Sequence, residues 1–450
     1  MPSDHKRVDV LIVGAGAAGL AAARDLSQAG LHLAVIEARP RIGGRIFTRH
    51  DPHVPVPLEL GAEFIHGEAP ETLSIARAAG VAVVELSPAR DIATSGRFIR
   101  TKDFWTGVDE MNRDLARRVA KRGRDFPVGE YLASAKLSAL KRSLLQGFVE
   151  GFYAAHPDRL SAQSVAADAD VEHDEGVEGH QFRIVNGYDA LMRWLRDGLD
   201  PDLTEVRMST VAQTVSWKRG DVAVECVGGD GAPLDVLRAR TALITVPLAL
   251  LRGGTPRFHP ALATKQRALR GIETGQIFKI ILRFRKAFWE DRSFLKERRG
   301  NGPGARAGMN FLYAPGVEVP TWWTQLPVRA PLLTGWVGGV AAETLLAEEQ
   351  QSRVERSLVA LSNVLAVPRR ELEGNLDAWA THDWCADPFA RGAYSYIGVN
   401  GIGAPSALGR PVEDTLFFAG EATNGAEIGT VAGALASGKR AAREVVRVLQ

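Results

Sequence analysis

The hydrophobic pattern begins with a short, nearly continuous apolar run at residues 8–13, which is typical of a central parallel strand. A glycine turn follows, and an alanine-rich segment that extends to about residue 29 predicts a helix. A second apolar run at 31–36 predicts the next strand. Together these segments predict a strand, turn, helix and strand unit of roughly 30 residues.

Later parts of the chain carry both helical and strand patterns. Residues 70–190 are predicted to be mostly helical, with a basic cluster at 113–124 on a solvated helix face. Apolar alternation predicts hairpin-like strands within 206–227 and 237–246 and a further strand at 276–284. The glycine-rich segment 299–307 predicts an exposed loop.

The C-terminal residues repeat the order of the first ones. A strand is predicted at 415–419, followed by a turn and a helix from about residue 430. We therefore expect the two ends of the chain to share one domain.

Composition limits the classes of protein that fit this pattern. The 450 residues are 45% hydrophobic and 24% charged, which predicts a globular protein of about two or three domains. The formal charge is +2, so the broad positive field that nucleic-acid binding requires is not expected. The two cysteines, Cys226 and Cys385, provide neither a disulfide framework nor a cysteine-rich metal site, and we expect no metal.

Two observations bear on localisation. Residues 1–9 are polar and leave no room for a signal peptide. Uninterrupted apolar runs stay well below the roughly 20 residues of a membrane-spanning helix. We therefore expect a soluble cytoplasmic protein without a membrane partner, and a homodimer is one of the oligomeric states left open.

A glycine motif lies between the first strand and the first helix. Gly14, Gly16 and Gly19 form G-x-G-x-x-G, which allows a tight turn, close approach to a pyrophosphate and close helix–strand packing. The N–H groups at the start of this helix, near Ala18, then face the phosphates. Glu37 ends the second strand, where a carboxylate accepts hydrogen bonds from ribose hydroxyls. These residues predict a dinucleotide site.

Further blocks indicate which dinucleotide is expected. Glu37 is followed by Ala-Arg-Pro-Arg-Ile-Gly-Gly-Arg, and four more blocks follow in order at 59–67, 245–248, 384–396 and 418–423. The arrangement resembles the flavoprotein amine oxidase superfamily of monoamine oxidases, polyamine oxidases and histone lysine demethylases. The resemblance implies FAD as the cofactor.

The resemblance also implies an α/β fold, in which a Rossmann-like FAD-binding domain is combined with a discontinuous α+β substrate-binding domain. Residues 1–70, 195–260 and 390–450 are expected to form the FAD-binding domain. Residues 71–194 and 261–389 are expected to form the substrate-binding domain, with a helical part and a mixed sheet.

Cofactor contacts are assigned by the same resemblance. Arg45 and Glu421 are expected near the phosphates and ribityl chain, and Val211 near the adenine. Thr430 and Val431 are expected at the isoalloxazine, where a helix N-terminus stabilises the negative charge that a flavin gains on reduction. The expected FAD contacts are Gly14, Gly16, Ala18, Gly19, Glu37, Ala38, Arg39, Gly43, Gly44, Arg45, Gly61, Ala62, Glu63, Phe64, Val211, Trp384, Tyr394, Gly420, Glu421, Thr430 and Val431.

Lys279 is the first candidate catalytic residue. In the strand at 276–284, Phe278 and Ile280 lie on one face and Lys279 on the other, so its side chain is predicted to be buried. A buried, unpaired lysine is rare, which favours a functional role over a lysine whose end reaches solvent. In the amine oxidases a lysine at the matching position holds a water molecule against flavin N5, and the resemblance gives Lys279 this role.

Tyr394, His66 and Thr430 are candidate catalytic residues by the same resemblance. Tyr394 is expected to attract the amine through its ring and to favour the neutral amine by excluding water. His66 matches a histidine on the substrate side of the flavin, where it accepts a hydrogen bond or relays a proton; the alternative is a structural histidine. Monoamine oxidases have a second tyrosine at the position of Thr430. A threonine there is closer to the polyamine oxidase and demethylase branch.

Other positions separate this chain from parts of the superfamily. Ala393 stands where monoamine oxidases attach the flavin to a cysteine, so FAD is expected to be non-covalent. The chain is too short for the extra helical domains of the demethylases, so a histone substrate is not expected. Glu63 either adds negative potential toward a cationic substrate or pairs with an arginine, and the acidic stretch 168–175 is interpreted as a solvated loop.

Three tryptophans, Trp322, Trp323 and Trp336, either line the substrate pocket or pack in the core, and at least two of them are expected in the core.

These features predict an amine oxidase. Hydride passes from the amine α-carbon to flavin N5, the imine hydrolyses to an aldehyde or ketone, and O2 is reduced to H2O2. Both a monoamine and a polyamine stay open as the substrate. An L-amino acid oxidase is an alternative, although Glu63 and Phe64 stand where those enzymes carry an arginine for the carboxylate.

An FAD-dependent desaturase or dehydrogenase of the same fold is a second alternative, disfavoured by Lys279 and Tyr394. A non-enzymatic flavoprotein is the third.

Overall fold

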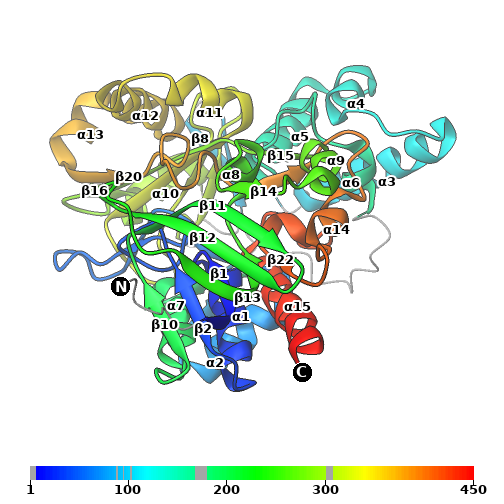
Figure 1. Cartoon of the computed structure of the whole chain (residues 1–450). Coiled ribbons are helices and arrows are strands. Elements are labelled where there is room, and N and C mark those ends of the chain that lie inside the picture. Colours follow the sequence, from blue (N-terminus) through cyan, green and yellow to red (C-terminus); the bar gives the residue numbers. More distant parts are fainter. Residues whose placement is uncertain (1–6, 88–89, 95, 102–103, 168–179, 301–307) are drawn as a thin grey trace.

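The computed structural model describes residues 7–87, 90–94, 96–101, 104–167, 180–300 and 308–450. Figure 1 shows three parts: helices α1, α2, α7 and α15 below a sheet, α11 to α13 at the upper left, and α3 to α6 at the upper right. The acidic stretch 168–175 and most of the loop expected at 299–307 lie outside the described residues.

An eight-stranded sheet carries both ends of the chain. Its order is β10-β2-β1-β13-β12-β11-β14, with β22 paired to β13, and β10, β2, β1, β13 and β22 run parallel. The strands are β1 (Val8–Val13), β2 (Leu33–Ile36), β10 (Thr204–Arg207), β11 (Thr210–Lys218), β12 (Asp221–Gly228), β13 (Leu237–Ile244), β14 (Arg257–His259) and β22 (Leu416–Phe418). The strands predicted at 8–13, 31–36 and 415–419 are therefore confirmed, the last two in shortened form.

Helices from both ends pack on this sheet. α1 (Ala17–Gln28) and α15 (Val431–Leu449) lie side by side, and Leu20 and Leu435 are fully buried in one apolar core (Figure 1). Gly438 allows this approach, because a Cβ there would overlap the carbonyl oxygen of Ala18. The first and last helices thus pack together, which is consistent with the expectation that the two ends of the chain share one domain.

The hairpin prediction at 206–227 is only partly correct. β11 and β12 form an antiparallel hairpin, but β10 pairs in parallel with β2 instead. Ser209, with φ of 49°, separates β10 from β11. The apolar alternation is the same for either partner, so it does not reveal this long-range pairing.

A seven-stranded sheet forms the wall of the upper part. Its order is β20-β16-β19-β18-β17-β7-β8, and its strands are β7 (Arg90–Thr94), β8 (Arg97–Thr101), β16 (Ile277–Phe284), β17 (Phe311–Tyr313), β18 (Thr321–Trp323), β19 (Leu332–Gly338) and β20 (Leu376–Thr381). On β16, Phe278, Ile280 and Leu282 face a core that includes Leu361 of helix α12. Lys279 points to the opposite face, as its place in the alternation predicts.

Helices cover more than half of the described residues in 70–190, as predicted, but the prediction missed the strands in this range. Four strands lie among its described residues: β7 and β8 in the seven-stranded sheet, and β6 (Val83–Glu85) and β9 (Gln181–Ile184) with β5 (Phe64–His66). β7 pairs with β17, which lies in a distant part of the sequence, and such short segments depend on partners that local periodicity does not identify.

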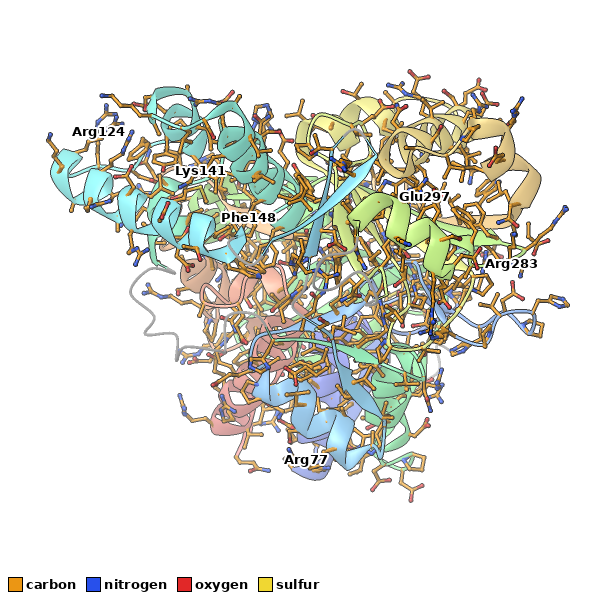
Figure 2. The ribbon with its side chains drawn as sticks, turned by 180° about the vertical axis from the view of Figure 1, so that it is seen from behind. Arg77, Arg124, Lys141, Phe148, Arg283 and Glu297 are labelled. Atoms are coloured by element: carbon orange, nitrogen blue, oxygen red, sulfur yellow. The ribbon has the colours of Figure 1, made fainter. Side chains whose placement is uncertain are left out.

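Helices α3 (Phe104–Arg122), α4 (Val128–Ser134), α5 (Ala139–Phe152) and α6 (Ala162–Ala167) form the third part. Figure 2 labels Arg124 at the outer end of this part and Phe148 on its inner side. Arg117 is largely exposed and pairs with Asp114, as expected for a solvated basic face.

The remaining elements connect these layers. They are β3 (Thr48–Arg49), β4 (Leu58–Glu59), β15 (Ile272–Thr274), β21 (Ser395–Ile397), α2 (Pro70–Ala78), α7 (Asp189–Asp197), α8 (Leu248–Arg252), α9 (Gln266–Gly271), α10 (Arg292–Arg299), α11 (Gly339–Leu346), α12 (Gln350–Leu365), α13 (Arg369–Asn375), α14 (Ala404–Gly409) and the 3-10 turns η1 (Ala263–Lys265), η2 (Phe288–Glu290) and η3 (Glu421–Thr423). Within the part of the chain described above, no helix is both long enough and apolar enough to cross a membrane.

Candidate active site

One cavity of about 1230 Å³ connects the glycine turn after β1 to the face of the seven-stranded sheet that carries Lys279. The predicted site residues line it, with the exception of Gly19. The cavity therefore brings together segments from the N-terminal, middle and C-terminal parts of the sequence.

The glycine turn leaves open space where a pyrophosphate would lie. Gly14 adopts φ of 112°, and Thr245 Oγ1 donates a hydrogen bond to the Val13 carbonyl oxygen at 2.9 Å. A Cβ added to Gly16 would meet no protein atom within 4 Å, whereas one on Gly19 would overlap the Gly14 carbonyl oxygen. Gly19 thus serves helix–strand packing and does not line the cavity, while its assignment as a cofactor contact stays a prediction.

Glu37 is held by backbone donors on both sides. Its Oε2 accepts from the Ala15 N–H at 2.9 Å, and its Oε1 accepts from the Arg39 N–H at 2.9 Å. This arrangement fixes the carboxylate beside the glycine turn, at the place where a ribose is expected.

Arg39 has partners that sequence reasoning missed. Its Nη2 donates to Asp387 Oδ1 at 2.6 Å, and its guanidinium carbon lies 5.5 Å from the ring centroid of Phe389. His382 Nε2 lies 2.9 Å from the other Asp387 oxygen. Asp387 and Phe389 belong to the 384–396 block, which was the available signal for this cluster.

Arg45 and Glu421 meet at the cavity wall, although 376 positions separate them. Arg45 Nη2 donates to Glu421 Oε1 at 2.9 Å, and Arg45 also contacts the carbonyl oxygen of Ala393. Glu421 further accepts from the Ser395 hydroxyl at 3.0 Å and from the Gly429 N–H at 3.1 Å. The carboxylate thereby joins three segments around the cavity.

Thr430 caps the last helix. Its Oγ1 accepts from the Gly433 N–H at 2.9 Å and donates to the Glu427 carbonyl oxygen at 2.8 Å. The start of α15, at Thr430 and Val431, faces the cavity. The side chain of Thr430 is thus committed to the helix cap, while the partial positive charge of the helix N-terminus points into the site.

Lys279 is buried, with 3% of its side chain exposed, and its Nζ donates to Glu63 Oε2 at 2.7 Å and to the Gly61 carbonyl oxygen at 3.2 Å. Glu63 Oε1 accepts from Arg183 Nη2 and Trp323 Nε1, both at 2.9 Å. Of the two roles considered for Glu63, pairing with an arginine is confirmed, and Lys279 is a second cationic partner.

Aromatic rings form much of the wall on the Lys279 side. Phe64 lies 5.5 Å from Trp323 and 5.6 Å from Phe311 between ring centroids, and Trp323 lies 6.1 Å from Trp336. Trp323 and Trp336 line the cavity, whereas Trp322 packs in the apolar core. Trp323 is at the same time buried in an apolar cluster with Leu86 and Phe311, so the expectation that at least two of the tryptophans pack in the core is confirmed.

Tyr394 and His66 contribute to the same wall. The Tyr394 hydroxyl donates to the Phe152 carbonyl oxygen at 2.8 Å, and burial raises the pKa of Tyr394 well above its usual range. The His66 ring faces the cavity, 5.6 Å from the Phe152 ring. Enclosure by the protein, together with Arg90, lowers the pKa of His66 to about 4, so this imidazole is neutral at pH 7.

Glu59, on β4, is a second buried carboxylate near Lys279. It accepts from the Tyr188 N–H and the Thr48 hydroxyl, each at 2.7 Å, yet burial raises its pKa to about 7. Glu59 keeps its proton up to about pH 7 in the folded protein, whereas in the unfolded chain it releases the proton near pH 4.5. The stabilisation of the folded state by this difference is complete below pH 4.5 and is lost as the pH rises through about 7.

We expect Glu59→Gln to flatten this pH dependence, because the neutral amide has no proton to lose. Thermal unfolding at pH 5, 6, 7 and 8 measures the effect: the fall in Tm between pH 5 and pH 8 should be smaller in the variant than in the wild type. Equal falls in both proteins would contradict the assignment.

Comparison with known proteins places this arrangement in a family. The model of the family "Flavin containing amine oxidoreductase" matches residues 17–446. The chain belongs to this family. The match confirms the predicted resemblance, and FAD is the cofactor that it implies. We call the glycine turn at 14–16, Glu37 and the Arg45–Glu421 pair the dinucleotide cradle.

Relatives in this family have different named activities. The chain is 26% identical over 469 residues to lysine-specific histone demethylase 2 of Homo sapiens, covering 99% of this chain and 54% of that protein. It is also 26% identical over 476 residues to polyamine oxidase 2 of Arabidopsis thaliana, covering 98% and 89%. The chain spans about half the length of the first of these relatives.

Solved structures share the fold. Putrescine oxidase bound to putrescine gives a TM-score of 0.79 at 20% identity, with 98% of this chain and 99% of that chain covered. Cyclohexylamine oxidase from Brevibacterium oxydans IH-35A also gives 0.79, at 21% identity and the same coverage. The predicted α/β amine oxidase fold is therefore confirmed.

The residues of the cradle fit FAD. Gly16 leaves open space beside the helix N-terminus, Glu37 is fixed next to it, and the Arg45–Glu421 pair lies farther along the same cavity. These groups match the needs of a pyrophosphate, a ribose and a polyol chain.

Proposed function

We propose that the chain is an FAD-dependent amine oxidase that takes hydride from the carbon next to an amine nitrogen and uses O2 as the electron acceptor. One observation carries this proposal: a single cavity joins the dinucleotide cradle to the buried ammonium group of Lys279 and to an aromatic wall that includes Tyr394. Bound FAD supplies the hydride acceptor at its N5 atom.

The residues of this chain then have defined tasks. The aromatic wall excludes water, which favours the neutral amine that can lose hydride. Tyr394 and Trp336 bound the space for the substrate, and the neutral His66 offers an acceptor or a relay for a proton. Lys279 is proposed to hold the water molecule of the oxidative step. The product imine hydrolyses to an aldehyde or ketone, and O2 is reduced to H2O2.

The wall favours an amine with an apolar substituent over a polyamine. Phe64, Phe311, Trp323 and Trp336 surround the space beside Lys279, and Glu63, the carboxylate among them, is already bound by two cations. Directly beside Lys279, a second ammonium group of a polyamine would therefore meet apolar rings and a carboxylate that is already paired. The other described carboxylates that line the cavity are Glu37, Glu68, Asp91, Asp109, Glu421 and Glu427.

An oxidase of amino acids is a second candidate, and one observation favours it. Arg90 lines the cavity, with its guanidinium carbon 4.7 Å from the Phe311 ring centroid. Burial lowers the pKa of Arg90 to about 10, which still leaves it cationic at pH 7. A cation on this wall suits a substrate that carries a carboxylate besides its amine.

Anaerobic mixing with substrates distinguishes these candidates. Benzylamine, cyclohexylamine, putrescine, spermidine and an L-amino acid are added in turn, and bleaching of the flavin band is followed before air is admitted. We expect benzylamine or cyclohexylamine to bleach fastest and air to yield H2O2. Bleaching only by the amino acid would transfer the assignment to the second candidate, and no bleaching by any amine would contradict the proposal.

The flavin is proposed to be non-covalent because Ala393 stands at the attachment position. Acid precipitation should release all of the flavin into the supernatant. Flavin retained in the pellet would contradict this.

A further inference from the structure

Lys279 lies in a buried cluster with Glu63, Arg183 and Trp323. Lys279 Nζ contacts one oxygen of Glu63, while Arg183 and Trp323 both donate to the other oxygen. All four side chains are buried: Lys279 is 3% exposed, Trp323 4%, Glu63 6% and Arg183 7%. Glu63 therefore has three donors and little freedom to rotate.

Arg183 is itself fixed. Its Nη1 donates to the Leu326 carbonyl oxygen at 2.8 Å, and its guanidinium carbon lies 5.2 Å from the ring centroid of Phe64. β5 and β9 pair Phe64 with Arg183, directly after Glu63 in the chain. The backbone register thus sets the arginine beside the carboxylate.

The charges of Lys279, Arg183 and Glu63 do not cancel. Lys279 and Arg183 bring two positive charges and Glu63 one negative charge, with Glu59 as the other carboxylate that interacts with Lys279. Burial alone would raise the pKa of Glu63, but the attraction of Lys279 and Arg183 outweighs it and lowers that pKa. Glu63 is therefore an anion whenever its neighbours are charged.

We propose that Glu63 is a positioning residue that holds Lys279 in place and keeps it protonated, so that Lys279 acts as a fixed positive charge rather than as a proton acceptor. The inference rests on the proposed oxidase function, in which Lys279 lies beside the flavin. Without the charge of Glu63, two buried cations would face each other. Lysine gives up its proton far more readily than arginine, so Lys279 would become the neutral amine.

Measurements on enzyme reduced with dithionite test this inference, because they need no amine substrate. The rate of reoxidation by O2 and the midpoint potential of FAD are measured from pH 6 to pH 9. In Glu63→Gln we expect a new proton-linked transition in both quantities, with reoxidation slower by on the order of tenfold on its alkaline side. The wild type should show only the transition near pH 7 that Glu59 contributes, and the new transition should disappear in Glu63→Gln/Lys279→Met.

Two further variants serve as controls. Glu59→Gln removes a buried carboxylate that makes no hydrogen bond to Lys279, so it should lose only the transition near pH 7 that Glu59 contributes, and its reoxidation should not slow on the alkaline side. Glu63→Asp keeps the negative charge and should restore most of the wild-type profile. If Glu63→Gln binds FAD and shows the wild-type profile, Glu63 is only structural and the inference is overturned.

The variant Lys279→Met gives a second test, which does not depend on whether Glu63→Gln folds. A fixed ammonium group predicts a constant difference in midpoint potential between the wild type and Lys279→Met from pH 6 to pH 9. Convergence of the two curves as the pH rises would mean that Lys279 titrates, and it would overturn the inference. The proposed oxidase function is tested separately, by following whether amines bleach the flavin. Its failure would therefore appear in that experiment and not in the measurements on dithionite-reduced enzyme.

Discussion

Replacing Lys279 by methionine is expected to slow amine turnover by about a hundredfold or more while FAD stays bound. The substitution removes the ammonium group that lies beside the proposed flavin position, but it keeps most of the length of the side chain. The fold should tolerate it, because Arg183 still balances the charge of Glu63 at 2.9 Å. Stopped-flow absorbance of the flavin, in the reductive and oxidative directions separately, measures which step is slowed.

A control must show that the loss is specific to the ammonium group. Lys265 is also buried, but its Nζ donates to the carbonyl oxygens of Ala407 and Leu408, away from the cavity wall. Lys265→Met should lower thermal stability with little change in turnover per bound FAD. Normal turnover in Lys279→Met would contradict the role given to this residue.

Gly16→Ala is expected to weaken FAD binding by roughly tenfold or more without unfolding the protein. Gly16 has an extended backbone that alanine adopts easily, and the added methyl group meets no protein atom within 4 Å. It would instead occupy the space where a pyrophosphate approaches the backbone. Titration of the apoprotein with FAD, followed by flavin fluorescence, gives the Kd.

Gly19→Ala provides the contrast. Its methyl group would overlap the Gly14 carbonyl oxygen, so α1 would be forced away from β1 and the apoprotein itself would lose stability. Thermal unfolding of both apoproteins separates the two effects. Equal FAD affinity in Gly16→Ala and wild type would show that the cofactor does not approach this turn.

Local patterns were sufficient to predict the cofactor cradle. β1, the glycine turn, α1 and β2 follow each other directly in the sequence, and the Ala15 N–H reaches Glu37 across only 22 positions. The contacts are made between near neighbours, so spacing and residue type define them. The alternation in β16 likewise placed Lys279 opposite Phe278 and Ile280, because side chains of a strand point to alternate faces.

Patterns of this kind did not predict the strands within 70–190. β6 and β9 are short, and each is stabilised by pairing with the other and, for β9, with β5. Segments this short have too few positions for a periodic signal, and β9 is far in the sequence from both of its partners.

By itself, the sequence determined the glycine cradle, the family of the chain and the buried face on which Lys279 lies. Only the tertiary structure decided what Lys279 contacts: Glu63 lies 216 positions away, and Glu63 is bound in turn by Arg183 and Trp323, at separations of 120 and 260 positions. A lysine predicted to be buried can be expected to have partners, because isolated charges are unstable away from water. Which partners it finds depends on how distant strands pair, and no local pattern carries that information.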